Sequence, residues 1–155
     1  MIVAKARDGL GYMRNETNTG VARRYYEEVL NKGNVGLLDE IALTDYTEND
    51  PLPGQLAGLE GLKGRVTAIK DAFGQTFKIE DLIADGDKVV VRWTGSGKQV
   101  GEFNGMPATG KEFTIAGIDI HRFKEGRMAE HWHVVDQLSQ LQQLGVIALP
   151  ELVSA

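Results

Sequence analysis

The apolar positions in the first half of the chain recur with the spacing of helices. Thr19 is the expected N-cap of a first helix, and Gly33 suits the position just beyond its end. A short second helix is expected around residues 35–43, and a third helix follows a proline- and glycine-containing loop at residues 44–54. The stripes of the first and third helices are Val21, Ala22, Tyr25, Tyr26, Val29 and Leu30, and Leu62, Val66, Ile69 and Phe73.

From Phe77 onward the apolar positions alternate, as they do in strands. FKIEDLIADGDKVVVRWTG reads as two strands around an Asp-Gly-Asp turn, and residues 95–113 read as a further hairpin with a long glycine-rich connection. IAGIDIHRF and RMAEHWHVV are the last two strands. A short helix over residues 137–144 closes the chain, with Asp136 as its N-cap. Helices followed by a run of antiparallel strands predict an α+β fold.

The turn at residues 124–126 decides which side chains of the last two strands share a face. A three-residue loop with a glycine at the bulge position gives pairing partners whose numbers sum to about 250. Asp119 then lies opposite His131, and His133 is one diagonal step away. Because side chains alternate between faces, these three residues and His121 project together. Such a cluster on one face of a sheet indicates a polar site, although histidines on strands often have only a structural role.

A two-residue turn at Glu125-Gly126 would put Asp119 opposite Trp132 and move the histidines to the opposite face. With the longer loop, the opposite face is largely apolar. Its members are Ile118, Ile120, Met128, Trp132 and Val134, with the charged Arg122 and Glu130. A face this apolar is expected to be covered by another subunit, which predicts a homodimer or homotetramer.

Length and composition fit one ordinary globular domain. The chain has 155 residues, 42% hydrophobic and 25% charged, with a net charge of −5 and no basic run, so neither nucleic acid nor a membrane surface is an expected partner. The absence of cysteine excludes disulfides and thiol chemistry. No signal peptide or transmembrane run is visible, and we expect a cytoplasmic protein. Residues 1–18 are expected to be an N-terminal arm, 19–149 the domain and 150–155 a C-terminal tail.

A curved antiparallel sheet with three N-terminal helices on its concave side forms a cone, whose mouth is a natural pocket for a small hydrophobic molecule. Residues 20–146 resemble the SnoaL-like polyketide cyclases, which have the NTF2-like α+β barrel fold. The phrases that carry the resemblance are VARRYYEEVLNKGNVGLLDEI, DYTENDPLPG, VVVRWTGSG, GEFNGMPATGKEF and, most specifically, RFKEGRMAEHWHVVDQLSQLQQLG.

The resemblance implies an enzyme that closes a ring by intramolecular aldol condensation, without a metal or an organic cofactor. In the family an aspartate on the strand containing the HW pair is the general acid/base, and a histidine on the neighbouring strand is its partner. In this chain the acid/base position is His133 and the partner position is Asp119, so the pair is exchanged. The second histidine of that strand matches His131. We therefore expect His133 to move the proton and Asp119 to orient its ring.

The resemblance also implies a set of substrate-binding residues. Asn49 stands at a loop position that is often histidine, and Gln99 replaces the histidine of the related phrase THTGEF. Tyr26 matches an aromatic residue that lines the pocket from the first helix. Trp93 is expected in the pocket wall or the core. His121 lies nearer the turn, and we expect a structural or solvent-facing role for it.

Other functions remain open from the residues. His131, His133 and Asp119 could form a two-histidine, one-carboxylate metal site, but the resemblance is to metal-free enzymes and we expect no metal. A non-catalytic ligand-binding module is the main alternative to a cyclase, because the family's aspartate is missing and fold does not fix function. An isomerase or dehydratase using the same residues is a third possibility.

Overall fold

The first helix is longer than the sequence predicts. The computed structural model describes residues 9–148, with the side chains of residues 17–148. Helix α1 spans Gly9–Arg24 and continues into a π-helical turn, η1, at Tyr25–Leu30. Thr19 therefore lies inside a helix and is not its N-cap, and residues 9–18 of the expected arm are helical. Residues 1–8 and the expected tail at 150–155 lie outside the described residues.

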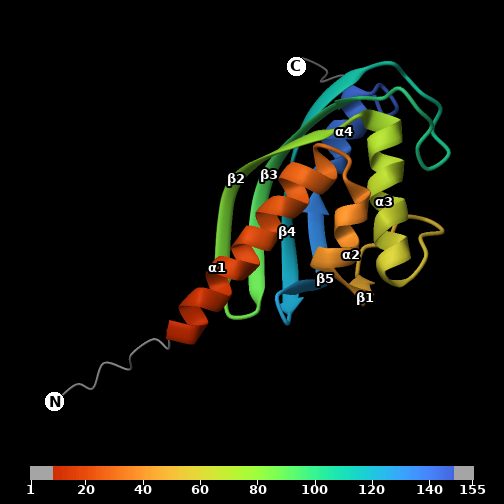
Figure 1. Ribbon diagram of the computed structural model, residues 1–155. Coiled ribbons are helices and arrows are strands. Elements are labelled where there is room, and N and C mark those ends of the chain that lie inside the picture. The colour runs from red at the N-terminus through yellow and green to blue at the C-terminus, as the bar shows by residue number, and fades with distance from the viewer. Residues whose placement is uncertain (1–8, 149–155) are drawn as a thin grey trace, which may run out of the picture.

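Five strands form one open, curved sheet in the order β1-β5-β4-β3-β2 (Figure 1). Strands β2 (Thr76–Asp85), β3 (Lys88–Lys98), β4 (Glu112–Lys124) and β5 (Arg127–Val135) pair in antiparallel fashion, as predicted. The hairpin expected at residues 95–113 is the end of β3 paired with the start of β4. Strand β1 (Ala42–Glu48) falls partly in the predicted loop and pairs parallel to β5. The loop prediction for residues 44–48 is therefore wrong.

The helices pack mainly on one face of the sheet. Helix α1 crosses this face, and it contacts β2, β3 and β5 (Figure 1). The short helices η2 (Val35–Leu37) and α2 (Leu38–Ile41) lead into β1, and α3 (Gly58–Phe73) packs against β1 and β3. Helix α4 (Gln137–Gln143) packs on β4, and the Asp136 side chain caps it by accepting from the Ser139 N–H, as predicted. The predicted α+β class is confirmed.

The turn between β4 and β5 differs from the prediction, yet the predicted face is correct. Glu125 and Gly126 both have positive φ, 52° and 74°, and form a two-residue turn. A bulge follows at once, because Ala129 has no partner between the pairs Phe123–Met128 and Arg122–Glu130. The shorter turn moves the register by one residue, and the bulge moves it by one more.

This double shift has two consequences. Asp119, His121, His131 and His133 all remain on the helix-facing side, as predicted, but Asp119 is now paired with His133 instead of His131. Met128 was assigned to the outer face, and this was wrong. It lies opposite Phe123, ahead of the bulge, and is completely buried in the core.

The outer face of the hairpin is exposed in the single chain. Val134 is 76% exposed and Ile118 is 48% exposed. The homo-oligomer inferred from this face stays a prediction. Among the described residues, no helix is long and apolar enough to cross a membrane.

Candidate active site

A cavity of about 590 Å³ lies between the helices and the sheet. One part of its wall is apolar. The other part is polar and is formed by side chains of the 50–53 segment, α3, β4 and β5. The apolar wall includes Leu30, Ile69, Phe73, Phe77, Trp93 and Ile115, and the polar wall includes Asp50, Arg65, Asp119, His131 and His133. Both the volume and this amphipathic lining are typical of small-molecule sites.

The three histidines form a stack that leads from the core to the cavity. The rings of His121 and His131 are 4.7 Å apart and nearly parallel, and those of His131 and His133 are 5.2 Å apart. His121 is completely buried and bonds to Tyr26, so of the two expected roles the solvent-facing one is excluded and the structural one is left. The His131 side chain is 7% exposed and that of His133 is 17% exposed. His133 is therefore the member of the stack with the greatest access to a ligand.

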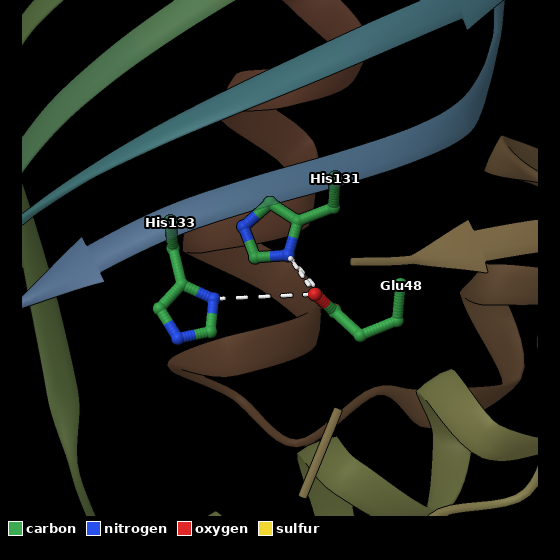
Figure 2. Close-up of side chains that lie close together, drawn as sticks. All are labelled: Glu48, His131 and His133. Carbon is green, nitrogen blue, oxygen red and sulfur yellow. Dashed lines mark hydrogen bonds and ion pairs between the residues drawn. The ribbon is translucent and has the colours of Figure 1, made fainter. Parts of the chain in front are cut away.

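His131 lies between two carboxylates. Its Nδ1 is 2.8 Å from Glu48 Oε2, because the parallel register of β1 and β5 places Glu48 beside it (Figure 2). Its Nε2 forms a longer ion pair, 3.6 Å, with Asp119 Oδ1. Burial alone would lower the pKa of His131, but the two carboxylates outweigh it and raise this pKa to about 9. His131 is thus a buried imidazolium at neutral pH.

Asp119 is held in its ionised form by the same network. Its burial opposes ionisation, but His131 and the hydroxyl of Tyr26 lower the Asp119 pKa to about 2. The Tyr26 O–H donates a short hydrogen bond to Asp119 Oδ2. Having used its only proton, the Tyr26 oxygen accepts from His121 Nε2, 3.1 Å away. Burial lowers the pKa of His121 to about 3, which keeps that ring neutral.

His133 occupies a different electrostatic environment. Burial and the neighbouring Arg65 guanidinium lower its pKa, so the imidazole is neutral at neutral pH. The Arg65 Nη2 atom is 3.4 and 3.5 Å from the two ring nitrogens. The nearest carboxylate oxygens of Glu48 and Asp50 are each 4.0 Å from His133 Nδ1, and Figure 2 shows the contact with Glu48. Asp119 bonds to Tyr26 and pairs with His131, so the expected role of Asp119 as the direct orienter of His133 is not the arrangement observed.

The expected substrate-binding residues are distributed unevenly around the cavity. Trp93 lines it, whereas Tyr26 lies behind the wall and the adjacent Tyr25 takes the lining position. The Asn49 amide donates to the His131 carbonyl at 2.9 Å and holds the end of β1 to β5. Gln99 is completely buried and accepts from the Thr109 hydroxyl, which fixes the loop between β3 and β4. None of these three residues lines the cavity: Tyr26 and Asn49 bond to residues of the site, and Gln99 holds the β3–β4 loop.

Two residues of the site were missed in the sequence. Glu48 lies in the strand that was read as a loop, where alternation with the buried Tyr46 would have placed it on the inner face. Arg65 lies three residues after Leu62 and four before Ile69, so it interrupts the apolar stripe of α3. A charge within an apolar stripe was the available signal for Arg65.

The histidine and carboxylate donor atoms lie close enough together to raise the question of a metal. Two groups, Glu48 with His131 and His133, and Asp119 with His121 and His131, each have donor atoms within 4.8 Å of one another. A dication would require His131 to lose the proton that its two carboxylates stabilise. The first group also lies against the Arg65 guanidinium, 3.9 Å from Glu48. These residues are better described as a charge-compensated ion network.

Comparison with known proteins identifies the family. Residues 20–144 match the model of the SnoaL-like polyketide cyclase family. The chain belongs to this family. Its NTF2-like fold is shared with solved SnoaL-like structures, and TsrD from Streptomyces laurentii superposes with a TM-score of 0.78 at 29% identity, over 85% of this chain and 97% of that one.

Two curated relatives are cyclases. The aklanonic acid methyl ester cyclase DauD of Streptomyces sp. strain C5 is 30% identical over 125 residues, 76% of each chain. The aklanonic acid methyl ester cyclase DnrD of Streptomyces peucetius is 32% identical over 93 residues, 59% of this chain and 64% of that one. The cavity wall of this chain contains His131, His133 and the largely buried Arg65.

Proposed function

We propose that this protein is a cofactor-free cyclase that closes a ring by intramolecular aldol addition within a small hydrophobic carbonyl compound. The observation that carries the proposal is the position of the His133 imidazole in the polar wall of the cavity, where burial and Arg65 lower its pKa and favour the neutral ring. Membership of the SnoaL-like polyketide cyclase family supports the reaction class. The cavity volume of about 590 Å³ is large enough for an aromatic polyketide fragment.

In this mechanism His133 acts first as a base and then as an acid. Its free ring nitrogen takes a proton from the carbon next to a carbonyl, and the C–H electron pair forms a C=C bond while the carbonyl π pair moves to oxygen. The enolate carbon then attacks the second carbonyl of the same molecule, and the new alkoxide receives the proton from His133. No atom is gained or lost, so the product is an isomer of the substrate.

The neighbouring residues set the proton affinity of His133. Burial of His133 disfavours a positive charge on its ring. The Arg65 guanidinium beside it and the His131 imidazolium stacked against it disfavour that charge further. Asp119 and Glu48 hold His131 in place and keep it charged, and Tyr26 donates a hydrogen bond to Asp119. Asp119 is thus a positioning residue for the stack: it pairs with His131, and its negative charge also acts directly on His133, whose pKa it raises against the effects of burial and Arg65.

Turnover of model substrates tests the proposal. Aromatic keto esters and keto acids, in which an acidic methylene can reach a second carbonyl, are incubated with wild type and His133→Ala. Because the product is isomeric, it is separated by chromatography and assigned by NMR. We expect the variant to lose turnover by at least about 100-fold with an unchanged melting temperature. Lys124→Gln, on the exposed end of β4, is the matched control and keeps the wild-type rate.

A His133→Ala variant that cyclises a true substrate at the wild-type rate would overturn the assignment of His133. A product with a shifted double bond, or one that has lost water, would instead identify an isomerase or a dehydratase.

A second candidate function is a ligand-binding module without turnover. The observation that favours it is the 4.0 Å distance from the His133 ring to its nearest carboxylates, which leaves the imidazole without a hydrogen-bonded carboxylate partner among residues 17–148. A bound compound that is recovered unchanged after long incubation would support this alternative.

A further inference from the structure

Arg65 is a charged side chain of the cavity wall whose nearest described carboxylate is 3.9 Å away. It lies in the apolar stripe of α3, and its side chain is only 11% exposed. It also borders a neighbouring hollow of about 330 Å³. The two hollows share Leu52, Pro53, Arg65, Phe103 and Asn104, which places the guanidinium where they meet.

The hydrogen-bonding capacity of Arg65 is largely unused by its neighbours in the described part of the chain. A guanidinium has five N–H donors. Arg65 Nη1 donates one hydrogen bond, 2.9 Å, to the backbone carbonyl of Asp50. Its Nη2 is nearly equidistant from both nitrogens of His133, so it is not directed at one acceptor. Its nearest carboxylate is Glu48, 3.9 Å away.

The carboxylates nearby are already engaged with other groups. Glu48 forms its short contact, 2.8 Å, with His131, and Asp119 bonds to Tyr26 and pairs with the same imidazolium. Asp50 Oδ2 accepts the backbone N–H of His133 at 3.0 Å and lies toward solvent. Among residues 17–148 the nearest carboxylate to Arg65 is 3.9 Å away, so this largely desolvated cation lacks a hydrogen-bonded carboxylate, and a ligand anion would supply one.

We propose that Arg65 selects a substrate with a free carboxylate, a hydrophobic aromatic keto acid in place of the corresponding ester. The aromatic body would fill the apolar part of the cavity near Trp93 and Phe77, and the carboxylate would pair with the guanidinium fork. The ketone would then lie beside His133, which contacts the same guanidinium. This inference rests on the proposed function only for the position of the ketone.

Binding of a matched acid and ester tests this selectivity. The probes are para-acetylbenzoate and its methyl ester, which share the aromatic ketone and differ in charge. Their dissociation constants are measured near neutral pH by ligand-observed NMR, with calorimetry where affinity allows. We expect wild type to bind the acid about 10-fold to 100-fold more tightly than the ester, the range for a hydrogen-bonded charge pair. In Arg65→Gln this ratio falls to about one.

Two further variants separate charge, geometry and folding. Arg65→Lys keeps the charge but loses the planar fork, so an intermediate ratio is expected. Lys63→Gln removes a positive charge from the same helix, where Lys63 pairs with Asp39 and Glu60 on the surface, and keeps the wild-type ratio. The ratio is taken within each protein, so a general loss of stability does not alter it, and melting curves identify any variant that fails to fold.

Equal binding of acid and ester by wild type, no binding of either probe, or an acid preference that survives in Arg65→Gln would each overturn the proposal. The binding ratio can be measured whether or not the protein catalyses a reaction. A wild type that selects the acid but never turns over a substrate would refute the proposed cyclase function and leave carboxylate selection standing. Turnover of esters alone would support the cyclase function and refute carboxylate selection.

Discussion

Replacing Asp119 by asparagine should change how the stability of the protein depends on pH. The change keeps the shape of the side chain but removes one of the two carboxylates that hold the His131 proton. The amide can still accept from the Tyr26 hydroxyl, and neutral His131 can accept from the amide. The variant therefore alters the charge without opening a cavity.

The magnitude follows from the pKa of His131. A rise from 6.5 to about 9 corresponds to roughly 3 kcal/mol, at about 1.4 kcal/mol for each tenfold change in proton affinity. Because the folded-state pKa is raised, this stabilisation is fully present below the unfolded pKa of 6.5 and is lost as pH rises through about 9. Asp119 and Glu48 share the effect, so Asp119→Asn should remove roughly half of the pH-dependent change.

Urea unfolding followed by circular dichroism, from about pH 6 to about pH 9.5, measures the free energy of unfolding in both proteins. Subtracting the two profiles cancels groups that titrate alike in both. Asp81→Asn is the control, because it removes an exposed carboxylate paired with Arg92 on β2 and β3. Parallel profiles for wild type and Asp119→Asn would refute the inference that Asp119 holds a proton on His131.

Two further variants test the packing behind the cavity. Tyr26→Phe removes the hydrogen-bond donor to Asp119 and the acceptor for His121. It should lower the free energy of unfolding by about 1.5–3 kcal/mol, measured by urea titration near neutral pH. A loss below about 0.5 kcal/mol would contradict this hydrogen-bond network. Gly117→Ala places a methyl group 2.2 Å from the Trp93 ring, so the indole or the backbone must shift, and the Trp93 fluorescence and the ligand affinity should change. An unchanged spectrum with wild-type binding would show that the position of the ring does not depend on this glycine.

The sequence predicts the local elements of this fold well and the non-local ones poorly. Alternation identifies β2 to β5, and helical spacing identifies α3, because each pattern lies within one short segment. Strand β1 pairs with β5 in parallel from far away in the chain, and no turn signal marks that pairing. Because the prediction missed β1, it also missed Glu48, the residue that holds His131 most closely.

The histidine face was predicted correctly although the register was wrong. Glu125 adopts a positive φ, which a sequence rarely signals outside glycine and asparagine, so the turn is one residue shorter than expected. The unpaired Ala129 then shifts the pairing by one more residue, which returns the histidine side chains to the predicted face. The sequence predicts Asp119 directly opposite His131. The two side chains do form an ion pair, but across the diagonal, because the backbone partner of Asp119 is His133.

The central claim is that His133 is a neutral base in the ligand cavity, next to a charged His131. NMR titration of the three imidazole rings, with and without para-acetylbenzoate, tests it most directly, and His133→Ala assigns the signals. Near neutral pH we expect His131 to be protonated, His121 and His133 to be neutral, and the ligand to shift His133 most strongly. A protonated His133 beside a neutral His131, or a His133 signal unmoved by a ligand that binds, would contradict the account.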